Sequence, residues 1–220
     1  MKTFMVGVLV FFGLIICSEV FAGESDSYFT YQSPYDPLFV NLDASSSNML
    51  IESLYSEDLN LVFSALKKIG DIKLKAAKVN VKDVLGFANP AANYGKPMEQ
   101  AKRKNIYLLS IWVLGRIGDD KDAEILASYI KDSSDIETHY YIILALGELA
   151  PSVKALDALN RMTEYVTDER LAKACINAIL KHNSKTSIIP LLKMSERPIF
   201  SPEFKKIIAN TIDQLGKTGK

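Results

Sequence analysis

The sequence has few of the residues that carry enzyme chemistry. Of its 220 residues only two are histidine and two are cysteine. His139 and His182 lie in different parts of the chain, and no cluster of metal ligands accompanies either of them, so we expect no metal site. Gly115 to Gly118 has neither the preceding strand nor the Lys-Ser/Thr of a phosphate loop, and Gly-x-Ser-x-Gly does not occur. These absences favour a non-enzymatic protein without a cofactor.

The sequence also lacks an excess of charge and any strand pattern. Twenty-six basic residues face 26 acidic ones, which argues against a general nucleic-acid or anionic-membrane binder. No segment shows the apolar–polar alternation of a β-strand. Because 48% of the residues are apolar, the chain has ample material for a core. We therefore expect an all-α protein.

The one long apolar run lies at the start of the chain. Lys2 precedes the apolar stretch 4–16, and Val20-Phe21-Ala22 then ends in the small-x-small style that signal peptidase accepts. This order is typical of a secretory signal peptide over residues 1–22. The run is too short for a membrane anchor. We expect an exported bacterial protein of the periplasm or cell envelope. An alternative stays open, because residues 14–17 (LIIC) resemble a lipobox, which would lipidate Cys17 and tether the chain to a membrane.

If the leader is removed, a single cysteine remains. Cys175 has no partner for an internal disulfide, so packing must stabilise the mature protein. Its neighbours in LAKACINAIL place it on the apolar face of a helix, where a free cysteine behaves as a small hydrophobic residue.

A repeat organises the rest of the chain. Five helix-closing sequences align on Gly70, Gly118, Ala150, Asn183 and Gly216, with spacings of 48, 32, 33 and 33 residues. The first spacing carries an insertion of about 15 residues relative to the others. Two prolines, a glycine and two asparagines at 89–97 predict a surface loop at 89–98 that accounts for it.

Hydrophobic periodicity and capping residues predict five helix pairs in a repeat domain over 47–216. An aromatic-rich arm (23–46) precedes this domain and a polar tail (217–220) follows it. The expected helices cover residues 49–55 and 58–69, 73–88 and 98–117, 122–131 and 135–149, 152–165 and 167–182, and 186–195 and 201–215.

Residues 113–149 (VLGRIGDDKDAEILASYIKDSSDIETHYYIILALGEL) resemble the HEAT-like repeats of phycobiliprotein-lyase-type proteins. The resemblance implies an α–α superhelix, or solenoid, of about five stacked helix pairs whose second helices line a concave inner face. Chromophore lyase activity is not implied, because no chemistry-bearing cluster accompanies the repeats.

The repeat register predicts a strip of apolar side chains on the inner face. An exposed apolar patch of this kind usually marks an interface, so we expect the strip to bind a partner. The alternative is that curvature or a register offset buries these residues. The strip comprises Phe63, Tyr107, Ile111, Trp112, Tyr140 and Leu144.

Aromatic residues are also dense in the arm, where Pro34 and Pro37 favour an extended conformation. We expect this arm to lie on the folded body of its own chain or of a neighbour; a disordered linker is the alternative. Its aromatic residues are Tyr28, Phe29, Tyr31, Tyr35 and Phe39.

Together these features predict an exported scaffold or adaptor that binds a protein or peptide. The alternative is a structural envelope component, tethered through Cys17 if lipidated, that self-assembles by donating its arm.

Overall fold

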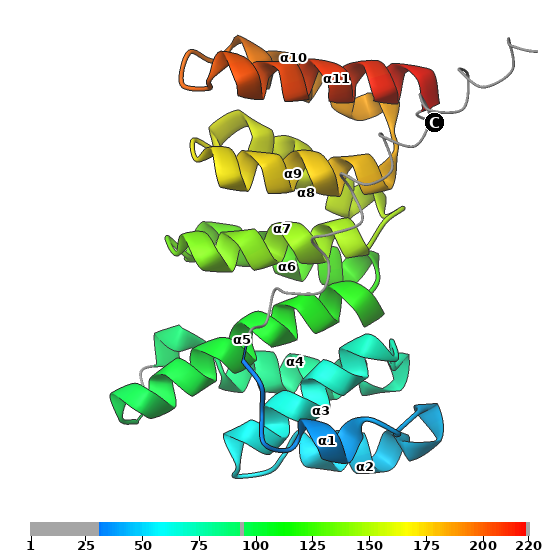
Figure 1. The fold of residues 1–220 in the computed structure, drawn as a ribbon, viewed down its shortest axis with the longest axis vertical. Helices are drawn as coiled ribbons and strands as arrows, with labels where there is room; N and C mark the ends of the chain where they lie inside the picture. The colour runs from blue at the N-terminus through cyan, green and yellow to red at the C-terminus, as the bar shows by residue number, and fades with distance from the viewer. Residues whose placement is uncertain (1–30, 93–94, 219–220) are drawn as a thin grey trace, which may run out of the picture. The chain divides into compact units, whose positions relative to one another are not determined.

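The computed structural model describes residues 31–92 and 95–218, and within these ranges the chain is entirely helical, without strands (Figure 1). The prediction of an all-α fold is confirmed. Residues 1–22, which we expect to form a signal peptide that includes Cys17, lie outside the described residues, as do Tyr28 and Phe29. No helix in the described part of the chain is long and apolar enough to cross a membrane.

Eleven α-helices and four short 3₁₀ turns make up the described chain. The α-helices are α1 (Asp36–Phe39), α2 (Ser47–Ser53), α3 (Leu59–Asp71), α4 (Lys78–Phe87), α5 (Pro97–Ile117), α6 (Asp120–Asp132), α7 (Ile136–Glu148), α8 (Val153–Tyr165), α9 (Glu169–His182), α10 (Ile188–Glu196) and α11 (Pro202–Thr218). The 3₁₀ turns are η1 (Ala44–Ser46), η2 (Lys75–Ala77), η3 (Pro90–Ala92) and η4 (Lys185–Ser187).

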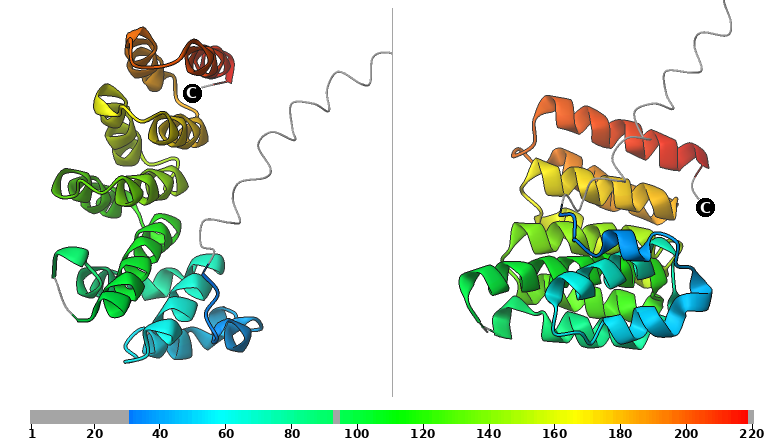
Figure 2. Two further views of the ribbon diagram at one scale, coloured as in Figure 1. Left: turned by 60° about the vertical axis from the view of Figure 1, so that its left-hand side comes forward. Right: turned by 60° about the horizontal axis from the view of Figure 1, so that its bottom comes forward.

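Residues 33–220 form one compact unit in which helical hairpins follow one another in chain order (Figure 1). The hairpins pair α2 with α3, α4 with α5, α6 with α7, α8 with α9 and α10 with α11. The odd-numbered helices from α3 to α11 contact each other in series and form one layer, and α6, α8 and α10 contact each other in the second layer. The left view of Figure 2 shows these two layers end-on.

Local capping explains where five of the helices begin. Each cap is a side-chain oxygen that accepts a hydrogen bond from a free amide of the first turn, which is why short polar residues precede the apolar runs. The caps of α3, α6, α7, α8 and α9 are Asp58, Asp119, Asp135, Ser152 and Asp168. Asp119 and Asp122 also form a reciprocal capping box.

The core lies between the two layers and between successive odd-numbered helices. Leu66 on α3, Leu109 and Leu114 on α5, and Ile142 and Leu146 on α7 are each fully buried. Apolar burial of this kind contributes on the order of 2 kcal/mol per large side chain, so the stacked hairpins stabilise one another.

The arm differs from its prediction. It was expected to be extended, but it contains α1 and η1, because Pro37 lies in the first turn of α1, where a proline breaks no helical hydrogen bond. Residues 33–40 pack against α3 of the same chain. The Tyr35 hydroxyl donates to Asp58 Oδ2 at 2.6 Å, Lys67 pairs with Asp36 at 3.1 Å, and Phe39 is buried.

Three boundaries also differ from the sequence prediction. The expected loop at 89–98 contains η3, and α5 already begins at Pro97, because proline is well suited to a first helical turn. The expected tail at 217–220 is helical as far as Thr218, whose hydroxyl donates to Asn183 Oδ1 at 3.0 Å. α3 continues through Gly70 to Asp71 instead of ending at the glycine.

Candidate interaction surface

The six residues of the predicted strip divide into two groups. Phe63, Tyr107 and Ile111 are 2%, 4% and 0% exposed, so the expectation that they face solvent is wrong. Trp112, Tyr140 and Leu144 are half-buried and reach the surface of the odd-numbered layer.

The division follows from helix geometry. Successive residues of an α-helix are about 100° apart around its axis, so two adjacent positions cannot both point directly to solvent. Ile111 turns into the contact between neighbouring helices, whereas Trp112 turns outward. Arg116, one turn after Trp112 on the same side of α5, also reaches the surface, whereas Leu108, one turn before it, is covered by neighbouring segments. Leu108 is buried and Arg116 is half-buried.

Two arginines cover the outward-facing aromatic rings. The Arg116 guanidinium lies over the Trp112 ring at 4.7 Å, and Arg170 of α9 lies over the Tyr140 ring of α7 at 4.8 Å. A cation over an aromatic face is attracted by the ring quadrupole, by about 0.5–1 kcal/mol at exposed sites. We call the surface formed by Trp112, Arg116, Tyr140, Leu144 and Arg170 the aromatic–arginine face.

The position of Trp112 depends on the absence of a side chain in α3. A Cβ placed on Gly70 would lie 2.5 Å from Trp112 Cζ3, closer than real contacts allow. The indole therefore lies directly against the backbone of Gly70, which joins α3 to the aromatic–arginine face.

The charges around this face are mainly positive. Lys173 is exposed on α9, and Lys181 of the same helix pairs with Glu148 of α7. Arg116 Nε is buried and has no hydrogen-bond partner among the described residues. The face thus offers apolar area together with several side chains that attract a carboxylate.

An open hollow of about 590 Å³ adjoins Arg116 at the ends of α5 and α7. Its walls include Arg116, Lys121, Asp119, Asp120 and Glu148, so both signs of charge are present. Lys78 donates to Asp119 at 2.6 Å and, with the Lys121 amide, holds the pKa of the Asp119 carboxyl at about 2. The acidic side of the hollow is therefore already neutralised in part by the protein itself.

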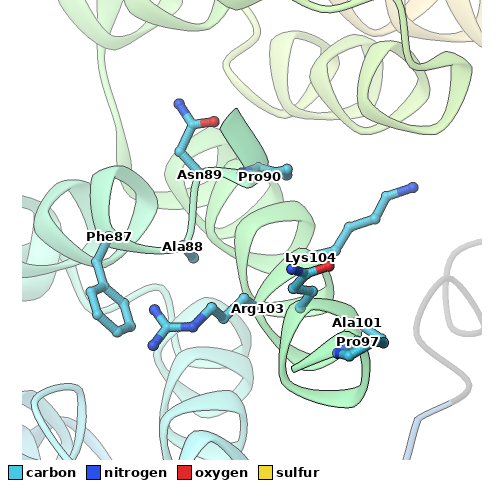
Figure 3. Close-up of a pocket in the computed structure, with 9 residues that line it drawn as sticks. Phe87, Ala88, Asn89, Pro90, Pro97, Ala101, Arg103 and Lys104 are labelled. Atoms are coloured by element: carbon cyan, nitrogen blue, oxygen red, sulfur yellow. The ribbon is translucent and has the colours of Figure 1, made fainter. Parts of the chain in front are cut away.

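A second cavity of about 320 Å³ lies where the chain passes from α4 to α5 (Figure 3). Arg103 extends from α5 towards Phe87 and lies 4.2 Å from its ring centroid, while Glu99 accepts two hydrogen bonds from the same guanidinium. Lys104 reaches across to Glu137 at 2.8 Å. Both cations thus make contacts within the chain, although Arg103 Nη1 is buried and has no hydrogen-bond partner among the described residues.

The remaining chemistry-bearing side chains are structural. Cys175 is fully buried, and burial raises the pKa of its thiol to about 12, so it is not a reactive thiolate. His182 is buried with Nε2 at 3.0 Å from the Leu146 carbonyl. Within the ranges that the structure describes, no three His, Cys, Asp or Glu side chains gather as a metal site would require.

Sequence reasoning missed the two arginines. Arg116 follows Trp112 by four residues, so helical spacing alone could have joined them. Arg170 and Tyr140 lie 30 positions apart on different helices, and no local pattern predicts that contact. A comparison of the chain with models of known protein families finds no match, and a comparison with curated proteins finds none either.

Proposed function

We propose that this protein is a non-enzymatic scaffold, a solenoid of HEAT-like helix pairs that binds an acidic segment of a partner protein on the aromatic–arginine face. The serial contacts of α3, α5, α7, α9 and α11 support the solenoid description. In such stacks each pair contacts only its neighbours, and one layer offers a continuous binding surface.

The aromatic–arginine face is the observation that carries the proposal. Trp, Tyr and Arg are the residue types that dominate binding energy at protein interfaces. Here Trp112, Tyr140, Arg116 and Arg170 lie on three successive helices of one layer. The rings and Leu144 supply apolar contact area, and the guanidinium groups favour a partner with carboxylates beside its apolar side chains.

Export is part of the proposal, and the leader-like sequence of residues 1–22 supports it. The mass of the protein recovered from a bacterial host tests it. We expect a chain that begins at Gly23, whereas a lipidated chain beginning at Cys17 would support membrane tethering.

Selection from a displayed library of random linear peptides tests the binding face. We expect selected peptides to be enriched in Asp and Glu next to apolar residues. Fluorescence polarisation should show that the double substitution Arg116→Glu, Arg170→Glu abolishes their binding. Arg161→Glu is the matched control, because Arg161 is exposed on α8 in the other layer.

Far-UV circular dichroism must show that the double variant is folded. Peptides without acidic enrichment, or peptides that bind the double variant as well as the parent, would contradict the proposal.

A further inference from the structure

The two ends of the stack carry opposite charge. Residues 33–58 form the N-terminal end with α1 and α2, and they include five acidic residues and no lysine or arginine. Residues 185–218 form the C-terminal end with α10 and α11, and they include six basic and three acidic residues. Residues 59–184 between the two ends carry 18 basic and 15 acidic residues, so within the described chain the acidic excess lies at the N-terminal end.

At the N-terminal end, part of the acidic charge is used within the chain. Asp36 pairs with Lys67, and Asp58 accepts from Tyr35 and caps α3. Asp43 and Glu52 are exposed and neither forms an ion pair with another described residue, although Asp43 Oδ1 caps η1 by accepting from the amide and hydroxyl of Ser45. They remain available to a partner.

At the C-terminal end, two cations are used within the chain. Arg197 donates to the carbonyls of Thr163 and Val166, and Lys217 pairs with Asp213. Lys205 is half-buried and Lys206 is exposed. Among the described residues neither lysine has an acidic partner.

Some positions of α11 are exposed although the matching positions of α9, in the preceding hairpin, are buried. α11 repeats α9 at an offset of 33 residues, so Ile208 corresponds to Cys175, and both are fully buried. Ile207 is 41% exposed, but its counterpart Ala174 lies one turn before Ala178 on the side of α9 that packs against Gly147 of α7, so Ile207 faces back towards α9. Ala209 is exposed as well.

The counterpart of Ala209 is Ile176, which is buried. α9 is followed by α11, but no described helix follows α11. Ala209 therefore marks the side of α11 that a following helix would cover.

The N-terminal end carries apolar side chains to match. Leu38, Val40 and Met49 are 62%, 67% and 49% exposed on or beside α1 and α2, close in sequence to Asp43 and Glu52. The right view of Figure 2 turns this end towards the reader, with α1 and α2 in front. Each end thus combines exposed apolar atoms with an excess of one sign of charge.

We propose that a second copy of this chain docks its α10–α11 end on the α1–α2 end of the first, so that copies associate head to tail. Lys205 and Lys206 then face Asp43 and Glu52, while Ala209 meets Leu38, Val40 and Met49. The two surfaces differ, so the contact is heterologous and leaves one free end of each kind. Association therefore continues beyond a dimer.

Sedimentation velocity of the full chain over a range of concentrations tests this assembly. We expect the mean mass to pass that of a dimer at low ionic strength and to fall as salt shortens the Debye length from about 10 Å at 0.1 M to about 3 Å at 1 M. Lys205→Glu, Lys206→Glu should abolish association, and Asp43→Lys, Glu52→Lys should do the same from the other end.

An equimolar mixture of these two double variants should associate again, because each reversed end then meets an end of opposite charge. Lys96→Glu, Lys121→Glu is the matched control: both lysines are exposed away from the ends, and this variant should associate like the parent. A monomer at every concentration, a mass that stops at a dimer, or a mixture that stays monomeric would overturn the assembly.

The result is independent of the proposed function. The end variants leave the aromatic–arginine face unchanged, so loss of assembly with retained peptide binding separates the two proposals.

Discussion

The Asp122 carboxylate is the most deeply buried charge of the described chain, with an exposure of 0%. It accepts the Asp119 amide at 2.8 Å in the capping box of α6 and pairs with Lys78 and Lys82 of α4. It therefore joins the second hairpin to the third. The ion pairs contribute less than a fully buried pair would, because both lysines are about one third exposed.

We expect Asp122→Ala to lower the free energy of unfolding by about 2–3 kcal/mol, since it removes the carboxylate that completes the capping box of α6 and leaves Lys82 without its ion pair, while Lys78 keeps Asp119. Asp120 lies two residues before Asp122 and is exposed, so Asp120→Ala should lower the free energy of unfolding by less than about 1 kcal/mol. Urea unfolding followed by far-UV circular dichroism measures both. Equal losses for the two variants would show that Asp122 acts only through the helix dipole.

His182 links stability to pH. Burial lowers its pKa from the ordinary value of 6.5, because the charged imidazolium loses hydration. As pH falls below 6.5, the unfolded chain binds a proton at this position before the folded chain does, so the free energy of unfolding decreases until the pH reaches the folded pKa. His182→Gln should reduce the change of the free energy of unfolding with pH, which urea midpoints measured from about pH 7 to 5 report. A slope identical to that of the parent would contradict the assignment.

At the scale of elements, close approach of α5 and α7 depends on Gly115. A Cβ at this position would lie 2.5 Å from Ala145 Cα and 2.6 Å from its carbonyl oxygen, and a backbone cannot yield as a flexible side chain does. We expect Gly115→Ala to destabilise the protein by about 1–3 kcal/mol or more.

Gly86→Ala is the matched control. Gly86 lies in α4 with nothing within 4 Å of its added Cβ, so alanine should stabilise the helix by about 0.5–1 kcal/mol. Thermal unfolding of the two variants should therefore shift in opposite directions. Parallel shifts would mean that helix propensity, and not the distance between helices, decides the outcome at Gly115.

The elements themselves could be predicted from sequence because their signals are local. Asp135 and Asp168 cap their helices through the amide three residues on, a relation that sequence spacing reveals directly. The expected helix at 152–165 differs from α8 by a single residue. The repeat of helix-closing residues likewise depends on spacing alone.

The surface could not be predicted as well, because exposure depends on contacts between distant segments. Phe63 lies on an apolar stripe in sequence, but whether that stripe faces solvent is decided by the neighbouring segments that pack against it. The contact of Arg170 with Tyr140 requires two helices from successive hairpins. A one-residue error in register turns a side chain by about 100°, which is enough to exchange Ile111 with Trp112.

At the scale of the whole molecule, contacts in series imply that distant hairpins unfold with limited dependence on one another. The only tryptophan, Trp112, lies on α5 against Gly70 of α3, so its fluorescence reports on the first two hairpins. Ile208 is fully buried on α11, which contacts α9 and α10.

We expect Ile208→Ala, which removes a buried side chain at a cost of about 2–5 kcal/mol, to add an early phase to urea unfolding monitored by far-UV circular dichroism. The fluorescence midpoint should stay close to that of the parent, because the lost contacts lie three hairpins from Trp112. Leu66→Ala is the matched control: Leu66 is fully buried on α3, and its loss should lower the fluorescence midpoint directly. If Ile208→Ala instead shifts both signals together by the same amount, the hairpins unfold as one cooperative unit, and coupling along the stack is stronger than its nearest-neighbour contacts imply.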